Sequence, residues 1–313
     1  MSYKDQKYWK VVQSHLPVEY QLKKETLPKE EYWNWNGNRI HLDTYRNSEA
    51  PAKVILFHGL GTNGRQMTTI LGHPLAEDGY ETIAIDMPLY GETEPAKGKI
   101  IGYSDWVQCG NDYIDYELTR DDRPIFLYGL SAGGMETYHI AAVNKKVKGI
   151  IGMTFLDQRN DLVLKTTTKN EFWHRFGNPL AAFSCKIGLS GFRIKMSIPS
   201  KMTALCNDPE ALKALMDDPT SAGTKVNMKF LTEYASYVPV LEPEEFDVCP
   251  ILLTQPEEDR WTPQFLSDSF LVRVKKAVVK KVILRNGSHY PIEHEALEDL
   301  HKYAREFIEA NLK

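Results

Sequence analysis

The sequence has little of what marks an extracellular, metal-binding or membrane-spanning protein. It contains 4 cysteines in 313 residues, widely spaced and without a C-x-x-C pair, so neither a disulfide framework nor a metal site is expected. No apolar run reaches the roughly 18 residues that a membrane-spanning helix needs. The first ten residues, MSYKDQKYWK, lack the apolar core of a secretory signal. We therefore expect reduced thiols, a cytoplasmic location and no integral membrane association.

The sequence also lacks a strong charge of either sign. Its 38 Lys and Arg and 42 Asp and Glu give a net charge of −4, which offers no reason to expect a nucleic acid or an anionic membrane as partner. The densest basic run, residues 273–281, alternates with Val and Ala and is interpreted as the solvated face of a helix. Hydrophobic residues make up 42% of the chain, enough for a substantial buried core. Nothing in the composition calls for a cofactor.

Short apolar runs alternate with helix-like segments through the first half of the chain. After a loose helical or irregular arm over residues 1–28, Asn36-Gly37 joins two alternating segments and predicts a hairpin. Continuous apolar runs then predict buried strands at residues 53–57, 81–86, 125–128 and 148–156. Strands that alternate with helices indicate an α/β fold with a mainly parallel sheet.

This alternation of predicted strands and helices stops at about residue 158 and resumes at about residue 248. The stretch between contains several helical pieces, such as 209–216 and 228–237, many prolines and no clean buried strand. A connection of this length is expected to be a structured insertion. We therefore predict a catalytic domain of residues 1–157 and 248–313, with a mainly helical cap of residues 158–247. After the cap we expect strands at 250–254 and 281–284, and helices at 263–279 and 291–312.

The pattern Gly129-Leu130-Ser131-Ala132-Gly133 directly follows the predicted strand at 125–128. A buried strand, G-x-S-x-G and then a helix are the context of a nucleophile elbow. The tight turn holds its serine in a strained backbone conformation, and the flanking glycines let strand and helix approach closely. We therefore predict that Ser131 is a nucleophile.

A serine hydroxyl needs a base, and the base needs an acid to orient it. Both are expected after the nucleophile in the chain, each just beyond the end of a strand. His289 follows the strand at 281–284 after a short glycine turn and is the predicted base. His294 should lie a helical turn further on and is the weaker candidate.

Three carboxylates compete for the role of the acid. Asp259 lies in the turn between the strand at 250–254 and Pro263, and it is the favoured candidate. Its neighbour Glu258 and Asp157, at the end of the preceding strand, remain alternatives. Asp86 also ends a strand but precedes the serine, so we expect it to brace the following turn.

An oxyanion hole requires two fixed N–H donors. The backbone N–H of Ala132, next to the nucleophile, is expected to be the first. The second should come from the glycine-rich loop His58-Gly59-Leu60-Gly61, where Leu60 is the predicted donor.

With these residues in view, the sequence resembles the α/β-hydrolase superfamily and, more narrowly, serine hydrolases of the lysophospholipase and monoacylglycerol-lipase type. The resemblance extends from about residue 30 to the end. It rests on residues 58–61, Asp86 with Tyr90-Gly91, residues 129–133, Asp259 with Pro263, and His289 with Glu293. Two positions depart from the family: Pro256 and Ser288 stand where glycine is usual.

The resemblance implies hydrolysis of a carboxylic ester through an acyl-serine intermediate, without a cofactor. The expected substrate is a small-molecule ester. The apolar content of the insertion suits an acyl chain or an aromatic group, but such residues more often form helix-packing core, so the substrate class stays open. A thioesterase, a capped aminopeptidase and a carbon–carbon bond hydrolase would use the same triad. A non-catalytic ligand-binding protein with this fold is the alternative from another class.

Overall fold

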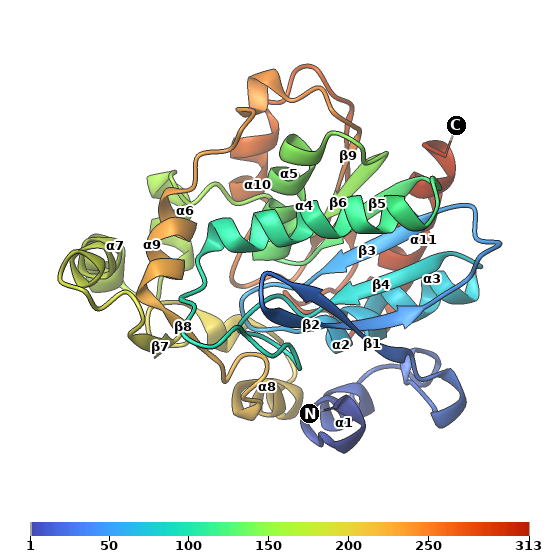
Figure 1. Ribbon diagram of the computed structural model, residues 1–313, viewed down its shortest axis with the longest axis horizontal. Helices are drawn as coiled ribbons and strands as arrows, with labels where there is room; N and C mark the ends of the chain where they lie inside the picture. Colours follow the sequence, from blue (N-terminus) through green and yellow to red (C-terminus); the bar gives the residue numbers. More distant parts are fainter. Residues whose placement is uncertain (1, 313) are drawn as a thin grey trace.

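An eight-stranded sheet runs through the centre of the molecule (Figure 1), in a computed structural model that describes residues 2–312. Its strand order is β1-β2-β4-β3-β5-β6-β9-β10. The pairs β1·β2 and β2·β4 are antiparallel, and all other pairs are parallel, so the predicted mostly parallel α/β sheet is confirmed. The bounds are β1 Lys29–Trp35, β2 Asn38–Tyr45, β3 Lys53–Phe57, β4 Glu81–Ile85, β5 Ile125–Gly129, β6 Gly149–Gly152, β9 Ile251–Pro256 and β10 Val279–Leu284.

Helices cover both faces of this sheet (Figure 1), which is why the central strands are continuous apolar runs. Every residue of β3, β4, β5, β6 and β9 is buried. One face carries α2 Gly64–Met67, the π-helical turn η4 Thr68–Gly72, α3 His73–Glu77 and α11 His294–Ala310. The other carries α4 Tyr103–Arg120, α5 Ala132–Asn144 and α10 Gln264–Leu271.

The predicted hairpin is confirmed between β1 and β2. Asn36 and Gly37 adopt φ values of 47° and 79°, the pair of positive angles that a type I′ turn requires. These two residue types tolerate such angles at low cost. The turn therefore fixes the register in which Trp35 lies opposite Asn38.

The N-terminal segment is partly helical, one of the two forms expected for it, but it packs on the rest of the protein instead of forming a loose arm. It forms short helices, η1 Tyr3–Asp5, α1 Tyr8–Ser14, η2 Val18–Tyr20 and η3 Lys24–Thr26. The fully buried Tyr3 donates its hydroxyl to both carboxylate oxygens of Asp86, at 2.8 and 2.9 Å. The guanidinium of Arg65 lies over the rings of Tyr3 and Trp9, 4.6 and 4.5 Å from their centroids. Tyr3 and Trp9 thus hold this segment to the rest of the protein. These two residues alone form no periodic hydrophobic pattern, so hydrophobic periodicity in the sequence could not reveal them.

Two predicted boundaries after the insertion are wrong. The helix expected at 263–279 ends at Leu271, and the basic run 273–281 forms a turn and the first residues of β10. β10 is the edge strand of the sheet, and its exposed Lys280 and Lys281 provide the charge that discourages edge-to-edge pairing. The basic residues therefore protect a strand edge instead of solvating a helix.

The inserted residues lie beside the carboxyl ends of the central strands (Figure 1). They are mainly helical, but a three-residue strand pair, β7·β8, was not expected from the sequence. The elements are α6 Asp161–Thr167, α7 Glu171–Lys186, β7 Arg193–Lys195, η5 Met202–Ala204, α8 Pro209–Asp217, β8 Lys225–Asn227, α9 Met228–Ser236 and η6 Pro243–Glu245.

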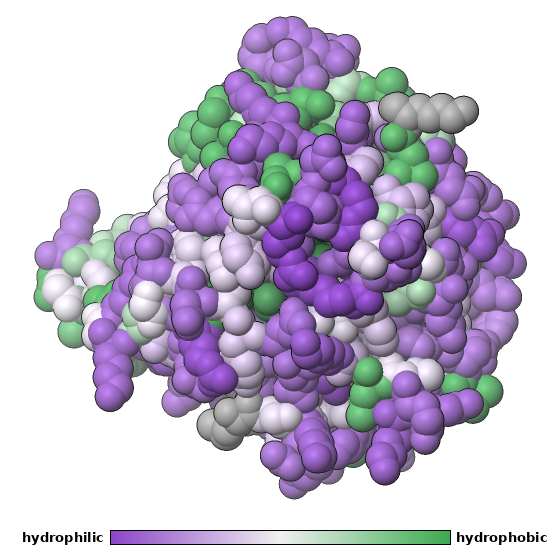
Figure 2. All heavy atoms as spheres, turned by 45° about the vertical axis from the view of Figure 1, so that its right-hand side comes forward, coloured by the Kyte–Doolittle hydropathy of each residue, from purple (hydrophilic) through white to green (hydrophobic). Residues whose placement is uncertain are grey.

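Figure 2 shows a face of the molecule that is largely hydrophilic, with hydrophobic side chains in separate groups. Among residues 2–312, no helix combines the length and the apolar character needed to cross a membrane.

The carboxyl group of Glu136 on α5 is a polar group that lies in the core without a hydrogen-bond partner among the described residues. It is fully buried, and burial raises its pKa well above the usual value. The folded protein thus retains a proton that the unfolded chain releases above about pH 4.5, so folding stability falls as pH rises above that value. We predict that Glu136→Met stabilises the protein by about 1–3 kcal/mol at pH 8 and by less at pH 5.

Thermal unfolding of both proteins across this pH range measures the difference. Glu25→Gln, a change at an exposed position, is the control and should leave the pH profile unchanged. If Glu136→Met raised the folding stability by the same amount at every pH, the pKa of this carboxyl group would not differ between the folded and unfolded states, contrary to the prediction.

Candidate active site

Ser131 lies in the turn between β5 and α5, with φ 56° and ψ −120°. The chain can make this turn only because the residues two positions before and two positions after Ser131 are glycines. A Cβ on Gly129 would lie 2.0 Å from the Gly133 carbonyl oxygen, and one on Gly133 would lie 2.6 Å from the carbonyl oxygen of Phe57. The structure therefore has the strained elbow that the sequence predicted, with a strained non-glycine residue at its apex.

His289 and Asp259 come together from two separate loops. The imidazole Nδ1 lies 2.8 Å from the Asp259 Oδ2 atom, and each side chain is only 1% exposed. The other ring nitrogen, Nε2, is buried and has no hydrogen-bond partner among the described residues. Residues 2–312 contain no hydrogen bond between Ser131 and His289, so the structure pairs the predicted base with its acid and not with its nucleophile.

The carboxylate of Asp259 accepts three further hydrogen bonds. The backbone N–H groups of Trp261 and Thr262 donate to Oδ1, both at 2.8 Å, and the Thr262 hydroxyl donates to Oδ2 at 2.6 Å. Burial favours the neutral acid, but the charge of His289 and these hydrogen bonds outweigh it and lower the pKa of Asp259. The group is therefore a carboxylate at neutral pH.

The alternative acids and the alternative base lie elsewhere. Asp157 forms a two-bond ion pair with Arg159, which also binds Glu242. Glu258 is exposed. The side chain of His294 is 51% exposed and lies 2.9 Å from a Glu19 oxygen. None of these carboxylates hydrogen-bonds His289 in the described part of the chain.

Two residues of this cluster were not anticipated from the sequence. The Thr262 hydroxyl lies 3.1 Å from His289 Nδ1 as well as bonding Asp259, and the Trp261 ring lies 4.9 Å from the imidazole centroid. An aspartate in a turn commonly accepts hydrogen bonds from backbone N–H groups a few residues further on. That pattern points to the backbone of residues 261 and 262, but no local signal indicates the contact of the Thr262 hydroxyl with His289.

The loop at 58–61 lies directly against the serine. A Cβ on Gly59 would be 2.8 Å from that of Ser131. The buried His58 ring holds the loop, because the Met87 N–H donates to its Nε2 at 3.0 Å and its Nδ1 lies 2.9 Å from the Gly59 oxygen. Burial lowers the pKa of His58, so a neutral ring with its proton on Nδ1 fits both contacts.

The short helix η5 of the insertion touches both loops of the site. Met202 lies beside Gly61, where a Cβ would be 2.6 Å from the methionine sulfur. The Leu205 oxygen, just after η5, accepts the N–H of Tyr290 at 2.7 Å. One segment of the insertion therefore braces the glycine-rich loop and the residue that follows His289.

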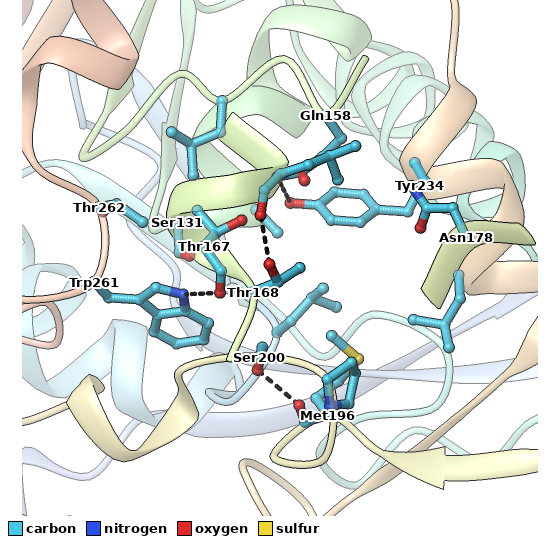
Figure 3. Close-up of a pocket in the computed structure, with 17 residues that line it drawn as sticks. Ser131, Gln158, Thr167, Thr168, Asn178, Met196, Ser200, Tyr234, Trp261 and Thr262 are labelled. Atoms are coloured by element: carbon cyan, nitrogen blue, oxygen red, sulfur yellow. Dashed lines mark hydrogen bonds between the residues drawn. The ribbon is translucent and has the colours of Figure 1, made fainter. Parts of the chain in front are cut away.

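Ser131 opens into a cleft between the sheet and the insertion (Figure 3). Leu60, Ala132 and Trp261 line it from the sheet side, while Asn178 and Tyr234 line it from the insertion. The lining is mostly apolar with several hydroxyl and amide groups, and none of its described residues is Asp, Glu, Lys, Arg or His. The cleft thus suits an uncharged ligand.

The sequence profile of the serine aminopeptidase (S33) family matches residues 48–296. No curated protein sequence matches the chain significantly.

Three solved structures illustrate the similarity of the fold. A monoglyceride lipase from Saccharomyces cerevisiae, solved with a substrate analogue, is 16% identical, with 93% of this chain and 98% of that one covered and a TM-score of 0.75. The monoacylglycerol lipase of Paleococcus ferrophilus is 20% identical, with coverages of 87% and 99% and a TM-score of 0.67. A carboxyl esterase from Bacillus coagulans is 17% identical, with coverages of 91% and 99% and a TM-score of 0.68. At such identities the likeness concerns the fold, while the family match covers most of the sequence. The chain belongs to the serine aminopeptidase (S33) family of α/β-hydrolases.

Proposed function

We propose that this protein is a serine hydrolase that cleaves carboxylic esters with the triad Ser131, His289 and Asp259. The observation that supports it best is the state of His289: Asp259 holds one ring nitrogen, and the other is buried without a partner. A buried imidazole fixed in this way is suited to accept a proton at Nε2. The strained serine that lines the neighbouring cleft is the group that needs such a base.

In the proposed mechanism the Ser131 oxygen attacks the ester carbonyl carbon while its proton passes to His289 Nε2. The carbonyl oxygen becomes an oxyanion, which accepts hydrogen bonds from the N–H groups of Leu60 and Ala132. The imidazolium then protonates the departing alcohol, which leaves an acyl-serine. Water, deprotonated by His289, attacks that acyl group, and the released serine regains the proton.

Asp259 acts through His289 in this scheme. Because its pKa is lowered, it is ionised when the imidazole takes up a proton, and it stabilises the imidazolium. The hydrogen bonds from the Trp261 and Thr262 backbone fix the carboxylate, so the ring is held with Nδ1 toward the acid.

The lining of the cleft favours esters over the alternatives with the same triad. An aminopeptidase would have to accommodate the ammonium group of its substrate, and an acidic residue is the usual partner for such a group. No Asp or Glu is present among the described lining residues. The lipase and esterase names of the structural relatives support the same choice.

A series of p-nitrophenyl esters with increasing acyl length, run beside matched thioesters and amino-acid anilides, tests the proposal. We expect kcat/KM to be highest for one of the esters and no measurable hydrolysis of the anilides. Preferential hydrolysis of the anilides would replace the ester hydrolase with an aminopeptidase, and a preference for thioesters would indicate a thioesterase.

We further propose the division into a catalytic part, residues 1–157 and 248–313, and a cap, residues 158–247. The position of the inserted helices beside the cleft supports it. A cytoplasmic location is proposed on the basis of Cys109, Cys185, Cys206 and Cys249, all of which are free thiols.

A further inference from the structure

The outer face of α7 is apolar along its whole length. Phe172, Phe176, Leu180, Phe183 and Ile187 are each between 47% and 58% exposed, and their spacing of three or four residues places them on one side of the helix. The chain that follows adds Leu189 and Phe192, 50% and 59% exposed. We call these seven residues the α7 face. At roughly 100 Å² for each half-exposed side chain, this face is larger than the apolar patches of most monomeric proteins.

The opposite side of α7 packs on the wall of the cleft. Ala181 is buried there, and the Cys185 sulfur lies 3.6 Å from the Thr232 hydroxyl of α9. Asn178 of α7 and Tyr234 of α9 line the cleft itself (Figure 3). The α7 face therefore lies on the side of α7 away from the cleft, and α7 itself is at the edge of the molecule (Figure 1).

The segment that carries the α7 face is rich in basic residues. Residues 161–201 contain seven Lys or Arg but only two Asp or Glu, in a chain whose overall net charge is −4. Lys186, Arg193 and Lys195 are exposed, and no acidic side chain in residues 2–312 lies within ion-pair distance of them. The net charge of −4 for the whole chain therefore does not describe this segment, which is positively charged. The expectation that the protein has no anionic membrane as partner, which was based on that net charge, does not extend to this segment.

The presence of basic residues beside the apolar α7 face distinguishes between a second copy of the chain and a phospholipid surface as its occupant. In a symmetric dimer formed through the α7 face, the basic residues of both copies would come close together and repel one another. An anionic phospholipid surface attracts the same residues while its acyl region accepts the aromatic and aliphatic side chains. A helix with an apolar stripe and flanking cations is typical of segments that lie in the plane of such a surface.

We propose that the α7 face docks reversibly on the surface of anionic phospholipid membranes. α7 then lies in the headgroup region with its apolar side toward the acyl chains, and the cleft behind it stays with the body of the protein. This interaction does not depend on the chemistry proposed for Ser131.

Co-sedimentation of the full-length protein with vesicles tests this proposal. Phosphatidylcholine vesicles that contain phosphatidylglycerol should bind the protein at least about tenfold more tightly than pure phosphatidylcholine vesicles, and added salt should weaken that binding. The double change Phe176→Ser and Phe183→Ser, and separately the triple change Lys186→Glu, Arg193→Glu and Lys195→Glu, should each lower binding at least about tenfold.

Phe265→Ser is the matched control, because Phe265 is 49% exposed on α10 and lies outside the α7 face. It should bind vesicles as the wild type does, and thermal unfolding of all variants shows that they are folded. Absence of vesicle binding by the wild type, or equal binding by the double variant, would overturn the proposal. A wild-type dimer that the double change converts to a monomer, without vesicle binding by either, would assign the face to a second copy of the chain.

Discussion

Ser131→Ala should lower kcat for a p-nitrophenyl ester by on the order of 10⁶-fold, the loss that follows removal of the nucleophile in a serine triad. The expected residual rate is that of a site that still binds the ester and still offers oxyanion donors, but forms no acyl-enzyme. Alanine keeps the Cβ and therefore the backbone strain of this position, and the hydroxyl that is lost lines the cleft without a hydrogen-bond partner in residues 2–312, so folding stability should stay nearly unchanged.

A fluorophosphonate probe gives a second measurement of the same change. The wild type should be labelled and Ser131→Ala should not. Ser200→Ala is the control, since Ser200 also lines the cleft but donates its hydroxyl to the Met196 carbonyl. Labelling that persists in Ser131→Ala would show that another residue is the nucleophile, and absence of labelling in the wild type would contradict the serine-hydrolase proposal.

Asp259→Asn should lower kcat by about 10⁴-fold. The amide is nearly isosteric with the carboxylate, but it carries no charge to stabilise the imidazolium and can hold the ring in the wrong tautomer. The Thr262 hydroxyl, which donates to the carboxylate at 2.6 Å, would keep the new side chain in place, so the loss should fall on kcat more than on KM.

Asp157→Asn is the matched comparison for the acid. This carboxylate is engaged by Arg159 at 2.8 and 2.9 Å, and weakening a partly exposed ion pair should cost activity less than about tenfold. A larger loss in Asp157→Asn than in Asp259→Asn would show that the assignment of the acid is wrong.

Buried strands were the most predictable part of the fold. Residues 53–57 and 125–129 are covered on both faces of the sheet, so their sequences are unbroken apolar runs. A strand of the same length with one exposed face would alternate between apolar and polar residues. Residues 273–281 were misjudged because two adjacent lysines on an exposed edge strand give no alternating pattern. The N-terminal anchors were missed for a related reason: Tyr3 and Trp9 are held by contacts with distant residues, which leave no local period.

The site was predictable where chain order and strand ends determine position. Asp259 and His289 follow β9 and β10, adjacent parallel strands, so topology brings them together at the same edge of the sheet. The competition with Asp157 could not be decided from the sequence, because that residue also follows a strand. What separates them is the partner of each side chain, Arg159 for one and His289 for the other, and partners far apart in sequence are visible only in three dimensions.

The contacts of η5 have a mechanical consequence. Met202 lies against Gly61, and the Leu205 oxygen binds the Tyr290 N–H, so a single turn of the insertion touches the loops proposed to carry the electrophilic and the basic halves of the chemistry. A fluctuation that lifts this turn would loosen both loops together. The positions of the two loops are therefore coupled through the insertion, and we expect a substitution at Met202 to change the geometry around Leu60 and around His289 together.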